Sequence, residues 1–184
     1  MKTIFLWILG FWTFHEPATE SIPADFTPSE KKLWEEIQQY RKSKKLPAIA
    51  WSPALTKVAR LHAADLRDFP PKAPCNMHSW SGKTPGAGTG CCYSSDHKNP
   101  GCMWEKPQEL AGYPAHGFEI SAMNTGPDPA WLAQWKTSSG HHQVIINQGI
   151  WKNVSWKAMG LAIRPPYAVV WFGQEPDSSK SAGH

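Results

Sequence analysis

Helical spacing of apolar residues is clearest near the start of the chain. Thr27 is a candidate N-cap, Pro28 suits the first helical position, and Glu30 completes a capping box. Apolar side chains then recur on one helical face. The sequence therefore predicts a helix that ends near Lys44, because the Leu46-Pro47 step disfavours helical backbone.

Two further stretches open with the same signal, a polar residue followed by proline. Ser52-Pro53 begins a second amphipathic helix, which Pro70-Pro71 closes. Asp128-Pro129 begins a third helix. Trp131 and Trp135 lie four residues apart in it, so both belong to one helical face. We therefore expect Trp135 in the core rather than at a binding site.

Strand patterns dominate the C-terminal part of the chain. Residues 143–147 (QVIIN) predict a short strand, and residues 158–164 and 168–172 predict a hairpin joined by the turn Arg164-Pro165-Pro166-Tyr167. Residues 72–118 show neither period and are rich in glycine, proline and serine, so we predict a loop-rich segment without long helices or strands. Helices first and strands last indicate an α+β fold with layers around one sheet.

The length of the chain indicates the number of domains, and its charge argues against a nucleic-acid partner. The 184 residues suit one domain, which we place at residues 25–174, before a polar tail at residues 175–184. The net charge is +4, without a run of like charges. Lys42, Lys44 and Lys45 follow the first helix and suit a solvated helix C-terminus. We therefore expect no nucleic-acid partner.

The N-terminus predicts export. Lys2 supplies a short positive region before the apolar run Ile4–Phe14, which is too short to span a bilayer comfortably. We therefore assign residues 1–24 to a signal peptide and linker and expect a secreted protein, extracellular or periplasmic. The alternative is an uncleaved membrane anchor. No other segment of the sequence is long and apolar enough to span a membrane.

The number and spacing of the cysteines also indicate export. All four lie between Cys75 and Cys102, and an even number in an exported chain indicates two disulfides. Cys91 and Cys92 are adjacent, and because a bridge between neighbours is strained, we expect each to pair outward, with Cys75 or Cys102. A zinc–thiolate cluster is the weaker alternative, since the paired CxxC spacing is missing.

Several segments, taken in chain order, resemble proteins of the CAP superfamily (cysteine-rich secretory protein, antigen 5 and pathogenesis-related 1). They are Tyr40-Arg41, Leu46-Pro47, Trp51-Ser52-Pro53-Ala54-Leu55, Ala59-Arg60-Leu61-His62-Ala63, Trp135 with Ser138 and Gly140-His141, Val144-Ile145-Ile146-Asn147, and Met159-Gly160-Leu161-Ala162. Their joint order is more specific than any single motif, and the match covers roughly residues 30–173. The resemblance implies a three-layer α-β-α sandwich of CAP/SCP type with a large cleft.

The same resemblance implies a cleft built on histidine and glutamate. His141 matches the histidine of the family's GH segment, Glu119 in the loop before the third helix matches its glutamate, and His78 stands where its other histidine is expected. In many members such histidines bind a divalent metal, so His78 and His141 become candidate zinc ligands. The family's second acidic residue has no clear match; Gln134 is nearest, and Glu109 is a reserve candidate.

Other polar residues are weaker candidates for a functional site. His62 lies on an apolar helical face, where a satisfied core histidine is expected. His142 follows His141 and, on a strand or turn, would point to the opposite, exposed side. No serine stands in a GxSxG setting, and Ser139 is too near His141 in the sequence to use it as a base. The sequence therefore shows no obvious catalytic nucleophile.

We expect a secreted, non-enzymatic module that binds a small apolar ligand or an extracellular partner in this cleft. Aromatic residues near the site suit such a ligand; they are Trp80, Trp104, Tyr113 and Phe118. A zinc-dependent hydrolase with Glu119 as general base is one alternative. A cell-envelope structural or interaction protein with a vestigial cleft is another.

Overall fold

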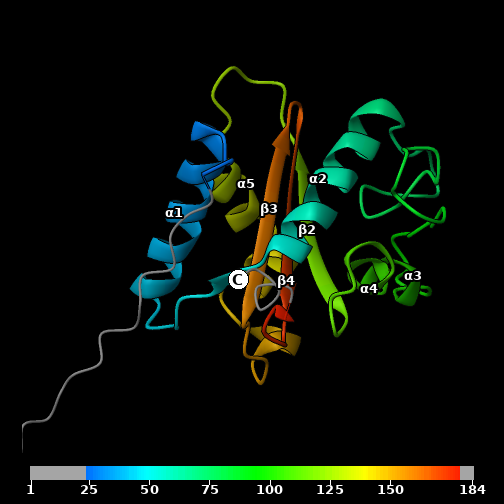
Figure 1. The fold of residues 1–184 in the computed structure, drawn as a ribbon. Coiled ribbons are helices and arrows are strands. Elements are labelled where there is room, and N and C mark those ends of the chain that lie inside the picture. Colours follow the sequence, from blue (N-terminus) through cyan, green and yellow to red (C-terminus); the bar gives the residue numbers. More distant parts are fainter. Residues whose placement is uncertain (1–23, 179–184) are drawn as a thin grey trace, which may run out of the picture.

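A computed structural model describes residues 24–178 of the chain. Within these residues, a four-stranded sheet lies between two layers of helices (Figure 1). The strands run in the order β1 (Ala50–Trp51), β3 (Ala158–Arg164), β4 (Tyr167–Gly173) and β2 (Gly117–Met123). Strand β1 pairs in parallel with β3, and the other pairs are antiparallel. The predicted α+β class, the layered arrangement and the C-terminal hairpin are confirmed.

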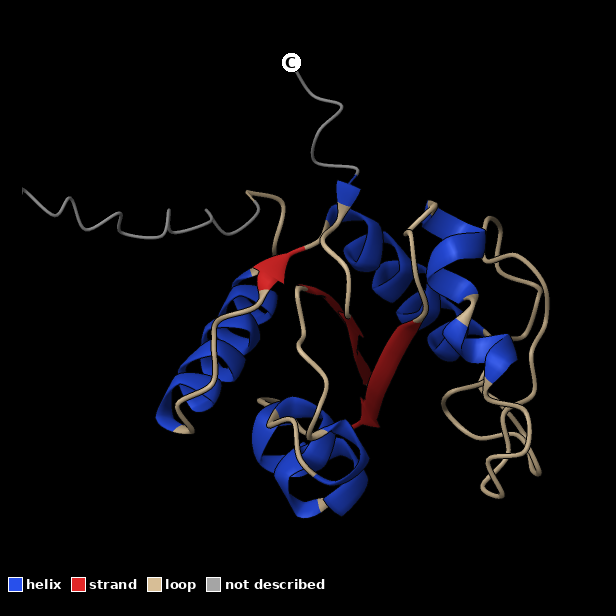
Figure 2. Ribbon diagram, turned by 90° about the horizontal axis from the view of Figure 1, so that it is seen from below, coloured by secondary structure: helices blue, strands red, loops and turns tan. Residues whose placement is uncertain are grey.

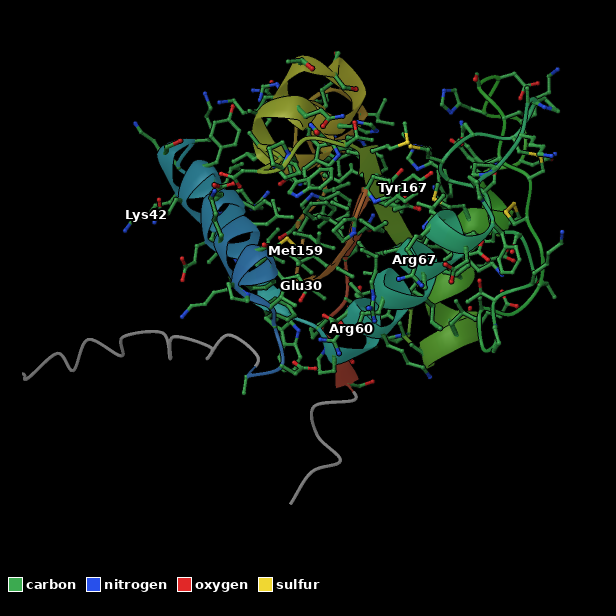
Figure 3. The ribbon with its side chains drawn as sticks, turned by 90° about the horizontal axis from the view of Figure 1, so that it is seen from above. Glu30, Lys42, Arg60, Arg67, Met159 and Tyr167 are labelled. Carbon is green, nitrogen blue, oxygen red and sulfur yellow. A yellow bond between two sulfur atoms is a disulfide. The ribbon has the colours of Figure 1, made fainter. Side chains whose placement is uncertain are left out.

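One layer of helices consists of α1 (Pro28–Ser43) and the short helices α5 (Trp131–Thr137) and α6 (Ser139–Ile145). The predicted capping box is formed, because Thr27 Oγ1 accepts from the Glu30 amide at 3.2 Å and Glu30 Oε2 accepts from the Thr27 amide at 2.8 Å. Glu30 Oε1 also accepts from the backbone N–H of Ile163 at 3.0 Å, which ties the start of α1 to β3. Lys42 projects outward at the opposite end of α1 (Figure 3).

The other layer contains α2 (Pro53–Asp68), α3 (Gly101–Trp104) and α4 (Lys106–Ala111). Helices flank the strands on both sides when the molecule is turned (Figure 2). Ser52 caps α2, as predicted, with its Oγ accepting from the Leu55 amide at 3.0 Å. Gly160 of β3 permits close packing of α2 on the sheet, because a side chain there would collide with the backbone of Leu55 and Thr56.

The sheet divides the core into two hydrophobic clusters. Alternate residues of a strand point to opposite faces. On β4, Val170 and Phe172 belong to the cluster under α1 and α5, whereas Val169 and Trp171 belong to the cluster under α2. All four side chains are fully buried. The last strand is therefore covered on both faces, which explains its continuous apolar sequence.

The third predicted helix supplies tryptophans to the core. Trp131 and Trp135 are 5% and 1% exposed and lie in the same cluster. The indole Nε1 of Trp135 donates to the carbonyl of Ser121 at 3.2 Å, so its polar atom is also satisfied. The predicted core position of Trp135 is confirmed.

Two predictions of secondary structure are wrong. Residues 143–147, predicted as a strand, lie mostly in α6, because a short apolar run fits a buried helical turn as well as a strand. Glu119, predicted in a loop, lies in β2. The alternation of apolar Phe118 and Ile120 with Glu119 and Ser121 is the signal that identifies this strand, since the two sets face opposite sides of the sheet.

Two disulfides hold the segment between α2 and β2. They are Cys75–Cys92 and Cys91–Cys102, with Cα–Cα distances of 5.0 and 5.8 Å. The expected outward pairing of the two adjacent cysteines is confirmed, and the structure fixes which partner each one takes. All four cysteines of the sequence are used in this way, which leaves none for a zinc–thiolate cluster.

The folded chain continues past residue 174, where the sequence placed the end of the domain. The hydroxyl of Tyr113 donates to the carbonyl of Glu175, and the carboxylate of Asp177 accepts from the Ala54 amide at 2.9 Å. Residues assigned to a polar tail thus contact α2 and the segment before β2. The predicted signal segment lies outside the described residues, except for residue 24. Within residues 24–178, no helix has the length and hydropathy needed to cross a membrane.

Candidate functional site

Glu119, His78 and His141 come from different parts of the chain and lie near one another. Glu119 is on the edge strand β2, opposite Trp171 of β4. His78 lies in the disulfide-bonded segment after α2, and His141 in the first turns of α6. Nδ1 of His78 is 3.4 Å from Oε1 of Glu119. The ring centroids of His78 and His141 are 5.9 Å apart.

A residue that the sequence left in the core, His62, also belongs to this cluster. Its Nδ1 lies 3.0 Å from Oε2 of Glu119, and both side chains are fully buried. Its Nε2 lies 3.0 Å from the carbonyl oxygen of Ser79, and its ring stacks on Trp80 with centroids 4.2 Å apart. His62 is buried in the core, as expected, but its Nδ1 lies against the carboxylate of Glu119. Only the packing of α2 against the sheet reveals this contact.

The two imidazoles determine the charge of Glu119. Burial alone would raise the pKa of its carboxyl group, but the positive charge of His62 and His78 and their hydrogen bonding lower that pKa to about 2. For His141, burial lowers the pKa, the charge of His78 lowers it further, and Glu119 partly offsets both effects. The cluster therefore holds an ionised carboxylate beside a histidine that favours its neutral form.

A cleft of about 390 Å³ opens beside this cluster. Aromatic side chains form much of its wall; they are Tyr93, Trp104, Phe118 and Trp151. His78 and Glu119 line it as well. Ile150 also lines the cleft and is 82% exposed, which makes it the most exposed large hydrophobic side chain among the described residues. The arrangement combines apolar walls with the His78–Glu119 pair and a second imidazole, that of His97.

The aromatic residues expected near the site divide into two groups. Trp104 and Phe118 line the cleft, with ring centroids 5.3 Å apart. Trp80 lies behind His62 and is 3% exposed, and Tyr113 is 1% exposed in the core under α2. The sequence missed Tyr93, whose ring meets His78 edge-on at 5.5 Å. It missed Trp151 as well.

The candidates for a second acidic residue are engaged elsewhere. Gln134 Nε2 donates to the carbonyl of Met123 at 3.1 Å. Glu109 pairs with the buried amine of Lys106 at 2.7 Å and accepts from the Thr89 amide at 2.7 Å. Neither side chain reaches the histidines.

The structure was searched for side chains that could together hold a metal ion. Among residues 24–178, no three histidine, cysteine, aspartate or glutamate side chains are arranged to hold one metal ion. His62 already lies against one oxygen of Glu119, so an imidazole occupies a position where a cation would otherwise balance the carboxylate. Zinc binding by His78 and His141 stays a prediction, and we derive no chemistry through it.

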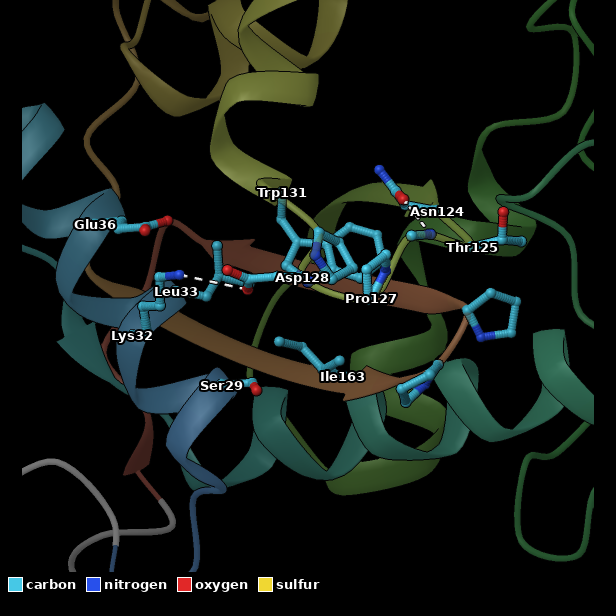
Figure 4. A pocket seen from close by; sticks show the side chains of 14 residues that line it. Ser29, Lys32, Leu33, Glu36, Asn124, Thr125, Pro127, Asp128, Trp131 and Ile163 are labelled. Atoms are coloured by element: carbon cyan, nitrogen blue, oxygen red, sulfur yellow. Dashed lines mark hydrogen bonds and ion pairs between the residues drawn. The ribbon is translucent and has the colours of Figure 1, made fainter.

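Two larger cavities have no histidine in their lining. One, of about 510 Å³, lies between α1, the segment before α5 and the turn after β3 (Figure 4). Its ion pair, Lys32 to Asp128 at 3.6 Å, joins side chains that are 60% and 87% exposed. The other, of about 640 Å³, lies between the end of α2 and the disulfides. Neither lining contains a histidine, so the aromatic cleft has the most distinctive chemistry.

His142 has a partner of its own. The Tyr40 hydroxyl lies 2.7 Å from Nε2 of His142, and the two rings stack with centroids 5.8 Å apart. The side chain is half-buried, so the predicted exposure is wrong. The reason is that residues 141 and 142 lie on a helix rather than on a strand.

Three solved structures share this fold. An outer surface protein from Borrelia burgdorferi matches with a TM-score of 0.56 and 19% identity, over 82% of this chain and 96% of that one. An extracellular protein containing an SCP domain from Bacillus anthracis matches with a TM-score of 0.54 and 18% identity, over 84% and 45%. A cysteine-rich secretory protein from Staphylococcus aureus matches with a TM-score of 0.53 and 13% identity, over 83% and 40%. The chain therefore spans less than half of the last two proteins.

Sequence comparison gives the family. No curated protein sequence matches the chain significantly. The family profile of the cysteine-rich secretory proteins, CAP, matches residues 34–159. This range includes the second helix, both disulfides and all four residues of the histidine–glutamate cluster. The chain belongs to the cysteine-rich secretory protein (CAP) family.

Proposed function

We propose that this protein is a secreted binding module whose aromatic cleft takes a small apolar ligand. The observation that carries the proposal is the cleft of about 390 Å³, walled by aromatic rings beside His78 and Glu119. Small-molecule sites combine mostly apolar walls with a few polar groups that fix the orientation of the ligand. Here the aromatic rings hold the apolar body, and His78 contacts its polar end.

Secretion is supported by the covalent structure. Disulfides persist in oxidising compartments, and both bridges lie in a segment with few long helices or strands to stabilise it. The structural neighbour from Bacillus anthracis is itself described as extracellular. The short apolar run near the N-terminus supplies the export signal in this proposal.

The same site supports binding better than hydrolysis. A general base needs a pKa near the working pH, and a pKa of about 2 makes Glu119 a poor proton acceptor. The hydroxyl of Ser79 donates to the Tyr93 carbonyl at 3.1 Å and accepts from the Tyr93 amide at 2.9 Å. The hydroxyl of Ser139 accepts from Gln143 at 3.0 Å. Neither serine is paired with a histidine in these contacts.

Binding of 2-methoxynaphthalene, a small neutral aromatic compound, tests the proposal. We expect saturable binding to the purified, oxidised protein, followed by ligand fluorescence. Trp151→Ala should weaken it by at least about tenfold, or ~1.4 kcal/mol, because one aromatic wall is lost. Lys32→Ala, in the cavity beside α1, is the matched control and should bind as the wild type does. Absence of saturable binding, or equal loss in both variants, would refute the proposal.

A further inference from the structure

The cavity of about 640 Å³ between the end of α2 and the disulfides carries charge of one sign. Among the described residues that line it, Lys72 and Lys83 are the charged ones, and none is an aspartate or a glutamate. Much of the remaining lining is apolar; it includes Phe69, Pro70, Pro71, Trp80 and the Cys75–Cys92 disulfide. A concave surface lined by cations raises the local concentration of anions. The cavity therefore suits a ligand that joins an apolar body to a negative charge.

The segment that carries Lys83 is fixed to α2 by a buried carboxylate. Asp65 of α2 is 1% exposed and accepts from the Ser81 amide and from the Thr84 hydroxyl, both at 2.7 Å. The Lys83 amide donates to Ser81 Oγ at 3.0 Å. The ammonium group of Lys83 lies over the ring of Phe69, 5.7 Å from its centroid. Lys83 is therefore held at the cavity by its backbone and by a cation–π contact with an aromatic wall.

Lys72 belongs to a turn that is constrained at both ends. The carbonyl of Lys72 accepts from the Cys75 amide at 3.0 Å, and Cys75 is bridged to Cys92. Pro70 and Pro71 precede Lys72 and restrict the backbone between α2 and this turn. The two lysines thus reach the cavity from two separately anchored segments.

The acidic residues near the end of α2 are engaged with other groups. Asp65 accepts from Ser81 and Thr84, and Asp68 pairs with Arg67 at 2.8 Å. Within residues 24–178, no carboxylate forms an ion pair with Lys72 or Lys83. An anion that enters the cavity would therefore meet two cations without displacing a carboxylate from either of them.

We propose that the cavity between the end of α2 and the disulfides is a second ligand site, which binds a carboxylate attached to an apolar body. The apolar body lies against Phe69 and the two prolines, and the carboxylate accepts from the ammonium groups of Lys72 and Lys83. None of the residues that line this cavity lines the aromatic cleft. The second site is therefore independent of the function proposed for the cleft.

A matched pair of probes tests the role of charge. 2-Naphthoate is ionised at about pH 7, above the ordinary pKa of a carboxyl group, and 2-naphthamide has the same aromatic body without the charge. We expect 2-naphthoate to cause saturable amide NMR shifts at residues that line the cavity, such as Phe69, Ser81 and Gly90. Its affinity there should exceed that of 2-naphthamide by about fivefold, because the lysines are exposed, and added salt should reduce this preference. Saturable shifts confined to cleft residues such as Gly140 and Ile150, no saturable shift, or equal affinity for both probes would overturn the inference.

Two double variants with the same loss of charge locate the site of the anion. Lys72→Gln/Lys83→Gln should remove the preference for 2-naphthoate over 2-naphthamide. Lys31→Gln/Lys42→Gln removes two exposed lysines of α1, in the other layer of helices, and should keep the preference. Trp151→Ala should keep it too, because Trp151 lines the aromatic cleft. Equal loss in both double variants, retention in Lys72→Gln/Lys83→Gln, or loss in Trp151→Ala would overturn the inference. The wild-type titration decides even if a variant fails to fold.

Discussion

Nδ1 of His62 lies 3.0 Å from Oε2 of Glu119, and both side chains are completely buried between α2 and β2. A buried carboxylate costs several kcal/mol in desolvation unless a partner balances it. His62 provides that partner from a helix, and His78 provides a second contact from the disulfide-bonded segment. The pair therefore links the stability of the domain to the geometry of its cleft.

Removal of the carboxylate should destabilise the domain. Glu119→Ala leaves His62 buried without its charged partner, and breaking a buried pair in this way costs ~3–5 kcal/mol. Urea unfolding of both proteins measures the difference. Glu105→Ala removes an exposed carboxylate and should change the free energy of unfolding by less than about 0.5 kcal/mol. Similar losses in the two variants would contradict a special role for the buried pair.

Acid should remove the stabilisation that Glu119 provides. Its pKa is lowered from 4.5 to about 2 on folding, so the unfolded state binds a proton more readily. The stabilisation is present above the unfolded pKa and is lost as the pH falls from 4.5 towards 2. The free energy of unfolding should fall more steeply over this window for the wild type than for Glu119→Gln. Parallel pH profiles would show that Glu119 does not contribute.

Trp135 should be among the most costly side chains to truncate. It is 1% exposed and donates a hydrogen bond to Ser121, so Trp135→Ala should cost ~3–5 kcal/mol. Trp151 is half-buried at the cleft, and Trp151→Ala should cost clearly less. Thermal and urea unfolding test both variants. Unaltered melting of Trp135→Ala would be inconsistent with the core described above.

Both disulfides should be present in the native protein. Mass spectrometry after alkylation without reduction should find no modified cysteine, and peptide mapping should find the pairs Cys75–Cys92 and Cys91–Cys102. Removal of either bridge should cost ~2–5 kcal/mol. Four alkylated thiols would contradict the bridges and the secreted location together.

Local signals in the sequence were sufficient to predict much of the fold. Thr27, Glu30 and Ser52 predict helix starts that the structure contains, because capping depends on residues only a few positions apart. The C-terminal hairpin is similarly local. Residues 143–147 mislead because their apolar run is too short to distinguish a strand from a buried helical turn.

The site could be predicted only from the family resemblance, because tertiary packing alone brings its residues together. His78, Glu119 and His141 are distant in sequence, and no spacing rule relates them. His62 gave the signal of an ordinary core residue because it lies on the same helical face as Leu55, Val58 and Leu66. Its contact with Glu119 arises only where α2 crosses the edge of the sheet.

The most direct measurement is amide-detected NMR of the labelled protein during titration with 2-methoxynaphthalene. The proposed function predicts saturable shifts at residues that line the aromatic cleft, such as Gly140, Ile150 and Trp151. It predicts little change at Asn124, Thr125 and Ile163, which line the cavity beside α1. Shifts confined to that second set, or no saturable shift at any residue, would contradict the assignment of the aromatic cleft as the binding site.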